Sequence, residues 1–245
     1  MEDFNRIILI DKPAGISSFG VVAKVRWQLT EEKWRKMLIK NPQTSRKMAR
    51  VKVGHCGTLD PFATGLLILV SGKFTRRAQE FMKLDKVYKA EIMLGAVSST
   101  GDPEGKITQK NVEKIPEKSE IEQIIQQKFT GEIWQVPPIY SAIKINGQRA
   151  YKMARKSENN ENENAQKELE AKISPRKITI FDLEILKYDF PILEIRAHVS
   201  SGTYIRTLAQ DIGQALNCGA YAKNLRREKI GKFDIKDAKK LEDFA

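Results

Sequence analysis

Residues 54 to 67 read Gly54-His55-Cys56-Gly57-Thr58-Leu59-Asp60-Pro61-Phe62-Ala63-Thr64-Gly65-Leu66-Leu67. This segment holds one carboxylate, Asp60, among three glycines, a proline and two threonines, so the backbone must turn sharply around it. An apolar run, residues 66–70, follows at once and predicts a buried strand. The segment therefore predicts an acid that is held rigidly at the edge of a sheet, beside an open surface.

The chain that carries Asp60 is strongly basic. Its 245 residues include 43 Lys and Arg against 31 Asp and Glu, which gives a formal charge of +12. Such a field attracts phosphate backbones, so the charge favours a nucleic acid as partner over the alternative of a merely lysine-rich, solvated surface. A fixed acid in a positive protein indicates chemistry on a polyanion.

Composition excludes several protein classes. A hydrophobic content of 41% allows a real core, so the chain is globular rather than disordered. Cys56, Cys218, His55 and His198 are too scattered for a disulfide scaffold or a zinc site, which indicates a reducing compartment. The acidic N-terminus is no signal peptide and no apolar run could span a bilayer, so we expect a cytoplasmic protein. Adjacent side chains on an extended backbone point apart, so Cys56 is expected to pack rather than pair with His55 as a nucleophile.

Strands and helices alternate without a regular βαβ rhythm, which predicts an α+β fold in a single domain over residues 1–245. Strands are expected at residues 7–10, 66–70, 87–94, 177–188 and 192–200. Helices are expected after a cap at Ser17 or Ser18, at 74–84, at 119–129 with a capping box of Ser119 and Glu122, and at 204–216.

Two polar segments interrupt this pattern. Residues 33–52 contain eight Lys and Arg residues and no acid, as part of a basic insertion at 31–50. A solvated face or a floppy loop is the plain alternative, but the position directly before the Asp60 segment favours a contact with an RNA backbone. Residues 156–172 are rich in Asn and Glu, which predicts a low-complexity loop.

A second candidate cluster is Ser200-Ser201-Gly202-Thr203-Tyr204-Ile205-Arg206. Arg206 falls in the first turn of a predicted helix, where a cation opposes the helix dipole by about 0.3–1 kcal/mol and therefore needs a partner. A buried carboxylate would be one, and the guanidinium would keep that carboxylate ionised. Pairing at the surface with Asp211 or a phosphate is the alternative, which the spacing alone slightly favours.

Six motifs together resemble, in order from about residue 6 to 235, the TruB family of tRNA pseudouridine synthases. The opening motif is Ile10-Asp11-Lys12-Pro13-Ala14-Gly15-Ile16-Ser17-Ser18, and residues 54–65 match the catalytic motif. Lys86-Val87-Tyr88-Lys89-Ala90 resembles the base-stacking strand. Residues 138–144 with Gly147, Tyr151 and Ala154-Arg155 resemble the segment that grips the RNA, within an insertion at 138–176. Residues 202–207 and Leu225-Arg226-Arg227 resemble the last two motifs.

The resemblance implies the pseudouridine synthase fold, a mixed and mostly antiparallel sheet flanked by helices and RNA-binding loops. It implies an isomerase that flips a uridine out of the T-loop of tRNA, at position 55, and converts it to pseudouridine with no cofactor and no metal. Asp60 would be the essential aspartate, Tyr88 would stack on the base, and Arg206 would pair with Asp60. His55 would fill the space that the base leaves, and further substrate contacts would come from Lys12, Tyr204, Leu225, Tyr140 and Lys144.

Two features depart from the family pattern. Many bacterial members carry a further C-terminal RNA-binding domain, and this chain ends at Phe244-Ala245, so no full domain of that kind is expected. The 31–50 segment is longer than the usual link, and its cations are expected to add RNA affinity.

The expected partner is the T-arm of tRNA, with no membrane and no obligatory protein partner, and the expected state is a monomer. The alternatives are a non-catalytic tRNA-folding chaperone on the same fold and a guide-RNA-dependent catalytic subunit. The guide-dependent relatives use an additional domain that this sequence lacks.

Overall fold

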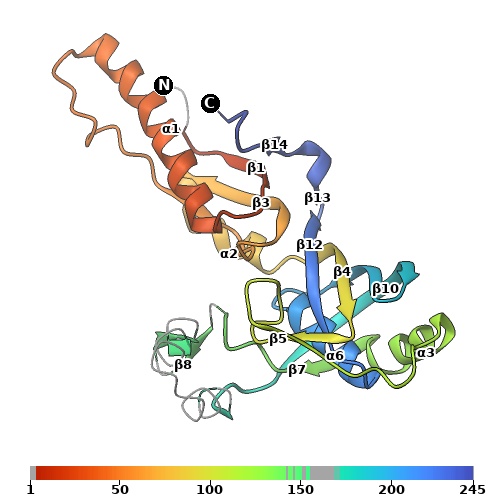
Figure 1. Cartoon of the computed structure of the whole chain (residues 1–245). Helices are drawn as coiled ribbons and strands as arrows, with labels where there is room; N and C mark the ends of the chain where they lie inside the picture. The colour runs from red at the N-terminus through yellow and green to blue at the C-terminus, as the bar shows by residue number, and fades with distance from the viewer. Residues whose placement is uncertain are drawn as a thin grey trace. The chain divides into compact units, whose positions relative to one another are not determined.

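A computed structural model describes residues 4–141, 143–145, 147–150, 153–154, 169 and 171–244. The chain divides into two compact units (Figure 1). The first comprises Met1–Tyr88 with Arg226–Ala245, and the second comprises Lys89–Leu225. Strands β4 (Lys86–Leu94) and β12 (Ala220–Ile230) contribute residues to both units.

The first unit is built on strand β3 (Thr64–Ser71), the predicted apolar run. β1 (Ile7–Lys12) and β2 (Val53–His55) pair with it antiparallel, and β12 pairs with it parallel through Arg226 and Arg227. β14 (Lys239–Lys240) lies parallel to β1, and β13 (Phe233–Asp234), followed by the 3₁₀ turn η2 (Ile235–Asp237), pairs antiparallel with β12.

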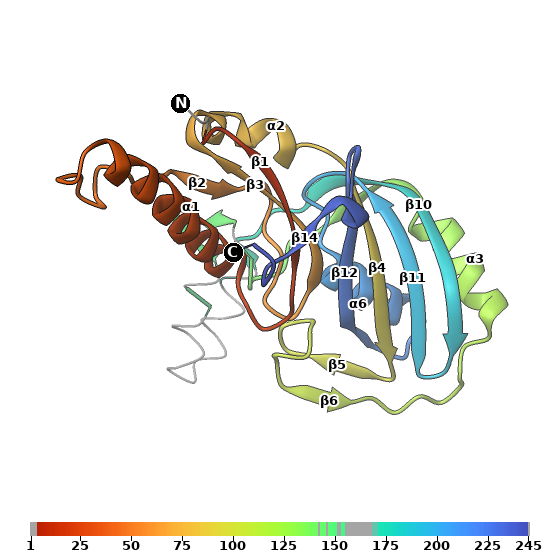
Figure 2. The ribbon, with the colours of Figure 1, turned by 90° about the horizontal axis from the view of Figure 1, so that it is seen from above.

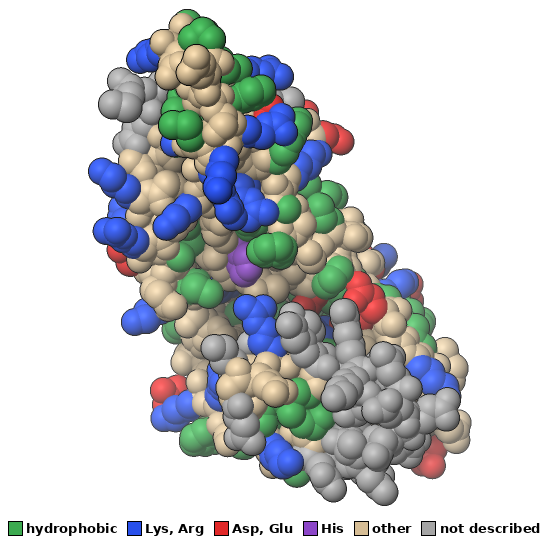
Figure 3. All heavy atoms as spheres, turned by 90° about the vertical axis from the view of Figure 1, so that its left-hand side faces the viewer, with side chains coloured by type: hydrophobic (Ala, Val, Ile, Leu, Met, Phe, Trp, Pro, Cys, Tyr) green, Lys and Arg blue, Asp and Glu red, His purple; other side chains and the backbone are tan. Residues whose placement is uncertain are grey.

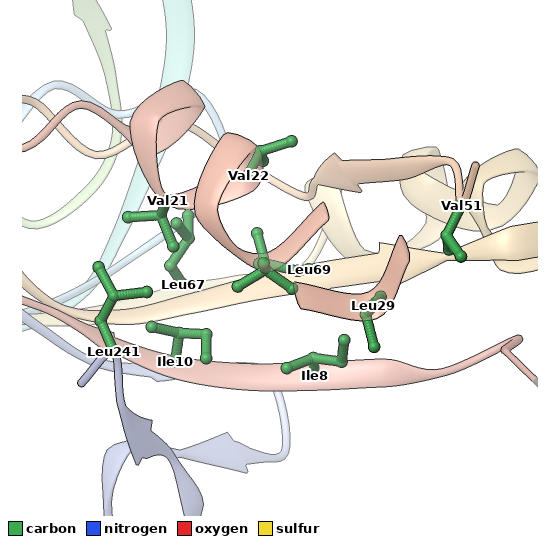
Figure 4. Close-up of a cluster of buried hydrophobic side chains, with 10 residues drawn as sticks. Ile8, Ile10, Val21, Val22, Leu29, Val51, Leu67, Leu69 and Leu241 are labelled. Carbon is green, nitrogen blue, oxygen red and sulfur yellow. The ribbon is translucent and has the colours of Figure 1, made fainter. Parts of the chain in front are cut away.

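Both faces of β3 are buried, which explains why its sequence is continuously apolar instead of alternating. Leu67 and Leu69 pack with side chains of β1 and helix α1 (Ser18–Lys40) (Figure 4). Leu66, Ile68 and Val70 pack on the other face in a second cluster with Cys56, Phe81 and Ile230. The Asp60 segment therefore enters a strand that cannot shift without exposing one of two cores.

Helix α1 begins where the sequence predicts. Ser17 is its N-cap, and the Ser17 hydroxyl accepts a hydrogen bond of 3.0 Å from the Gly20 N–H. The expected apolar stripe is buried, since Val21, Val22, Val25 and Leu29 are at most 2% exposed. The helix continues to Lys40, so the first half of the basic segment is helical and is not a loop. The expected helix at 74–84 is a 3₁₀ turn, η1 (Gly72–Arg77), followed by α2 (Ala78–Met82).

In the second unit the strand order is β4, β11 (Ile192–Val199), β10 (Arg176–Asp189) and β7 (Gly131–Gln135). β10 is antiparallel to both of its neighbours, and Figure 2 shows β4, β11 and β10 side by side with helix α6 (Ile205–Ala215) behind them. Two short hairpins are β5 (Ala96–Ser98) with β6 (Ile107–Gln109) and β8 (Lys144–Ile145) with β9 (Gln148–Arg149). With helix α3 (Lys118–Lys128), this mixed, mostly antiparallel arrangement confirms the α+β prediction.

Two sequence predictions have different outcomes. The capping box at α3 is wrong, because Glu117 is the N-cap residue and no side chain caps the helix. The polar loop at 156–172 lies outside the described residues apart from 169, 171 and 172, as do Tyr151 and Arg155. The described part of the 138–176 segment has a small core of its own, formed by Ile139, Ile145, Ala150, Ala154, Leu169 and Ile173.

Over the described residues, no helix combines the length and the apolar character of a membrane span.

Candidate active site

The side chain of Arg227 holds the backbone on both sides of Asp60. This side chain is 1% exposed, and its Nε donates to the Leu66 carbonyl at 2.8 Å. Its two terminal nitrogens donate to the carbonyls of Thr58 at 3.3 Å and Gly57 at 3.2 Å. One buried guanidinium therefore joins β12 to both ends of the loop that carries Asp60.

Ser18 and Lys12 support the other side of the loop. The buried Ser18 hydroxyl accepts from the Leu59 N–H at 2.8 Å and donates to the Leu59 carbonyl at 2.9 Å. The Lys12 ammonium, which is 0% exposed, donates to the carbonyls of Pro13, Ile16 and Pro61. The Pro61 carbonyl also accepts from the Gly15 N–H at 2.9 Å.

Every backbone carbonyl from Gly57 to Pro61 has a hydrogen-bond donor, since the Asp60 carbonyl accepts from the Ala63 N–H at 3.2 Å. Buried polar groups with full hydrogen bonding hold a loop in one conformation. The structure therefore fixes the backbone that carries the Asp60 carboxylate, as the sequence predicted.

Glycine is required at the exit of this loop. Gly65 has a φ of +106°, and a Cβ added there would lie 2.7 Å from the Arg227 backbone nitrogen. Gly57, at the entrance, has a φ of +117°. These two positions let the chain turn tightly and let β3 approach β12 closely.

The two residues before the loop differ in role. Cys56 is fully buried in the second core cluster, and burial raises the pKa of its thiol to about 11. A thiol of that kind is a poor nucleophile at neutral pH, which confirms the reading of Cys56 as a packing residue. His55 is half-buried at the end of β2, opposite Leu69.

Tyr88 lies on β4, where burial alternates strictly along the strand. Its side chain is 8% exposed and shares a face with Lys86 and Ala90. The Lys86 ammonium donates to the carbonyls of Met82 and Leu84, and burial, with the Arg227 charge as second cause, lowers its pKa to about 8. Lys86 therefore connects the end of α2 to the strand that presents Tyr88.

Arg206 in the second unit has the buried carboxylate partner that its helix position requires. The side chain is 3% exposed, and Nη1 lies 3.0 Å from Oδ2 of Asp102, itself 3% exposed. Nη1 also donates to the Thr100 carbonyl at 2.8 Å, and Nη2 donates to the Tyr140 carbonyl at 2.7 Å. The surface alternative, including the pairing with Asp211, is therefore wrong.

Asp102 was not identified from the sequence, although it lies in the turn-rich stretch Gly101-Asp102-Pro103-Glu104-Gly105. Its Oδ1 accepts from the Thr100 hydroxyl at 2.6 Å and from the Glu104 N–H at 3.0 Å, so both oxygens are engaged. An Asp between turn glycines is a local signal that could have singled it out.

Gln135 is a second buried polar residue near the candidate site that the sequence did not identify. It is 2% exposed, and its amide accepts from the Tyr204 N–H at 2.8 Å and donates to the Tyr204 carbonyl at 3.1 Å. It thereby fixes Tyr204, the N-cap residue of α6, two residues before Arg206.

The remaining site candidates are placed as follows. Leu225 is buried on β12, Tyr140 is half-buried, and Lys144 lies in β8 with its side chain outside the described part of the chain. The structure brings Lys12 and the Asp60 loop together in the first unit, and Tyr140, Tyr204 and Arg206 in the second. The expected pairing of Asp60 with Arg206 joins residues of different units and stays a prediction.

Comparison with known proteins gives one family. A family model described as TruB family pseudouridylate synthase (N terminal domain) matches residues 45–205, and one described as tRNA pseudouridylate synthase B C-terminal domain matches residues 206–245. A tRNA pseudouridine synthase B of Endomicrobium trichonymphae is 43% identical over 243 residues, which cover 97% of this chain and 90% of the relative. Its counterpart from Clostridium kluyveri is 39% identical over 236 residues, with 96% and 71% covered.

Solved structures with the same fold include a Cbf5-Nop10-Gar1 complex, at 27% identity and a TM-score of 0.66 over 98% of this chain. An H/ACA RNP bound to a substrate RNA containing 2′-deoxyuridine matches at 25% identity and a TM-score of 0.62. The chain spans about half the length of these two matched chains, 53% and 52% respectively. Likeness along the whole chain and a family model over most of it lead to one conclusion: this chain belongs to the TruB family of pseudouridylate synthases.

Proposed function

We propose that this chain isomerises uridine to pseudouridine in the T-loop of tRNA. The observation that carries the proposal is the loop around Asp60, in which each carbonyl from Gly57 to Pro61 has a donor. The reaction must break the bond from the sugar carbon to a base nitrogen and then join the same sugar carbon to a base carbon, without loss of the base. An anion that is held in one position suits such a reaction. The curated relatives are named for this activity on tRNA.

The reaction places three demands on the protein. The uridine must leave its stack, which costs a few kcal/mol, and an aromatic platform such as Tyr88 returns roughly 1–3 kcal/mol per base. The N-glycosidic bond must break and the base must rejoin through carbon, after which a proton leaves that carbon. In this proposal Asp60 starts the reaction at the flipped uridine, while His55 occupies the space that the base vacates.

Arg206 completes the proposed site. Its guanidinium plane is held by Asp102 and by two carbonyls, so it could offer its remaining capacity to Asp60 in a fixed orientation. A cation beside Asp60 would keep the carboxylate ionised at neutral pH. In this proposal Lys12, Tyr204, Leu225, Tyr140 and Lys144 contact the RNA.

Action on free tRNA by a cytoplasmic monomer, as one catalytic domain without a protein partner, belongs to the same proposal. Supporting it, the relatives are named tRNA pseudouridine synthase B, and this chain covers 90% of one of them. Two other classes of function, a non-catalytic chaperone and a guide-dependent subunit, make different predictions for an experiment with purified components.

The test uses purified protein and an unmodified tRNA transcript, with no guide RNA and no second protein. Chemical mapping of pseudouridine should show one modified position, in the T-loop. Tight binding without any pseudouridine would indicate a chaperone. Modification that starts only after a guide RNA is added would indicate the guide-dependent class, and either result would overturn the proposal.

A further inference from the structure

The basic segment forms a structured arm, residues 31–52, made of the second half of α1 and the loop that follows. Trp34 Nε1 donates to the Thr44 carbonyl at 2.8 Å, and the Val51 N–H donates to the Thr30 hydroxyl at 3.2 Å. Arg46 pairs with Glu31 at 2.5 Å and lies over the Trp34 ring at 5.2 Å. The loop is therefore fastened back onto the helix, so its cations have set positions.

Within the described part of the chain, the positive charge of the arm is only partly compensated by carboxylates. Its two carboxylates are already engaged, Glu31 by Arg46 and Glu32 by Arg6 and Lys36. Two exposed cations of the arm, Lys36 and Arg46, are paired in this way, but among the described residues no carboxylate pairs with the other five, which are Arg35, Lys40, Lys47, Arg50 and Lys52. In Figure 3 the upper part of the face, where the arm lies, carries clusters of Lys and Arg side chains. Such a surface is complementary to a polyphosphate backbone.

A hollow beside the arm has a mixed lining, in which Arg6, Arg35, Lys36 and Lys239 lie together with Glu31, Glu32 and Asp243. Its volume is about 630 Å³, and it opens along α1 and the C-terminal residues, where it is lined among others by Trp27, Arg35, Ile39 and Lys239. The Trp27 indole is 58% exposed. An exposed aromatic ring beside cations is typical of surfaces that bind nucleic acid by stacking and by charge.

Helix α1 sets the distance between the arm and the loop that carries Asp60. Ser18, its first residue, holds Leu59 in the catalytic loop, while Lys40 is its last. A helix of 23 residues is about 34 Å long. The arms of a tRNA are A-form helices, and a span of this length runs along several of their base pairs. Figure 2 shows the far end of α1 and its loop reaching beyond the strands of their own unit.

We infer that the arm is a second RNA contact, which grips the phosphate backbone of the substrate tRNA beyond the hairpin that carries the target uridine. The inference rests on the proposed function for the identity of the RNA. The apolar stripe of α1 formed by Val21, Val22, Val25 and Leu29 is buried in the core of its own unit. A phosphate backbone is the occupant that the free charge and the distance both fit.

The test compares a triple variant, Arg35→Gln with Lys40→Gln and Lys47→Gln, with a control of equal charge change in the second unit, Lys106→Gln with Lys128→Gln and Lys187→Gln. All six side chains are exposed. Equilibrium binding is measured for full-length tRNA and for an isolated T-arm hairpin across a range of salt concentrations, with melting temperature as the check on folding.

The arm variant should bind full-length tRNA roughly ten-fold or more weaker, and the slope of log K against log salt should fall by about 2–3, close to 0.9 per phosphate contact. Its loss on the hairpin should be much smaller, and the control should change little on either RNA. Equal losses on both RNAs would place the arm at the hairpin, and unchanged binding would make it a solvated face. Loss of self-association with unchanged RNA binding would make it a protein contact, so each of these results would overturn the inference.

Because binding is measured without turnover, these outcomes do not depend on pseudouridine formation. Absence of pseudouridine with wild-type protein would defeat the proposed function alone. In that case, weaker binding of full-length tRNA by the arm variant would still identify the arm as an RNA contact.

Discussion

Replacing Ser18 by Ala should loosen the loop around Asp60 while leaving helix α1 intact. The Ser18 hydroxyl makes two buried hydrogen bonds, both to the backbone of Leu59, which directly precedes Asp60. A buried group left without its partner costs about 1–3 kcal/mol. Two such groups, with some relaxation of the loop, give an expected loss of about 2–4 kcal/mol in the free energy of unfolding.

The effect on turnover should exceed what stability alone explains. A displacement of about 1 Å in a catalytic group can lower the rate by about 100-fold, and the Ser18 hydroxyl holds the backbone of Leu59, the residue directly before Asp60, by two hydrogen bonds. We expect single-turnover pseudouridine formation to fall by about one to two orders of magnitude at a temperature where the variant is folded.

Ser17 offers a matched control one residue away. Its hydroxyl caps α1 through the Gly20 N–H and makes none of the bonds to Leu59. Ser17→Ala should cost about 1 kcal/mol of stability, with turnover within about two-fold of wild type. Urea unfolding and single-turnover assays on both variants check this. If Ser18→Ala lost no more turnover than Ser17→Ala, the argument that the hydrogen-bonded loop positions Asp60 would be refuted.

Three further predictions concern residues around the site. Tyr88→Ala should lower turnover about 5- to 150-fold, from a stacking energy of roughly 1–3 kcal/mol, and Tyr88→Phe should change it little; equal effects in a turnover assay would count against stacking. Arg206→Lys should be nearly as inactive as Arg206→Ala, because one ammonium cannot reach both Asp102 and the Tyr140 carbonyl as the two guanidinium nitrogens do; near-normal turnover of the Lys variant would contradict this. The pKa of Lys86 is lowered to about 8 in the folded protein, so its destabilising effect is full below pH 8 and is relieved as pH rises toward the unfolded value of 10.5. Relative to Lys86→Met, wild type should gain about 3 kcal/mol in the free energy of unfolding between pH 8 and pH 10.5. If chemical denaturation showed no such gain, the claim that burial disfavours the charged form of Lys86 would be refuted.

The periodic parts of the fold could be predicted from the sequence. β4 alternates strictly, the stripe of α1 is buried as expected, and β3 reads as a continuous apolar run because both of its faces are covered. The length of α1 is not evident from the charge of residues 33–52, because a dense run of Lys and Arg also suits a loop. Trp34, Met37 and Leu38 stand at helical spacing and are the signal that the helix continues. β12 was not identified as a strand, since the charged pair Arg226 and Arg227 suggests a surface segment.

The candidate site shows the same division. Asp60 stands out by its setting of turn residues, and the need for a buried partner at Arg206 follows from the helix dipole. The identity of that partner, Asp102, and the supporting bonds of Arg227 depend on contacts between residues far apart in the chain, which local patterns do not encode. Arg227 donates only to backbone carbonyls. In the sequence it stands beside Arg226, and a pair of arginines suggests a solvent-exposed segment until the fold is known.

The central claim is that Asp60 carries out uridine isomerisation in tRNA. The most direct measurement compares wild type with Asp60→Asn, which keeps the shape of the side chain and removes only its charge, in single-turnover pseudouridine formation and in equilibrium tRNA binding. The account predicts tRNA binding within a few-fold of wild type and a rate below about 1%, a loss of at least about 2.7 kcal/mol in the barrier. A rate above about 1% of wild type with normal binding would contradict it and would place the catalytic group elsewhere.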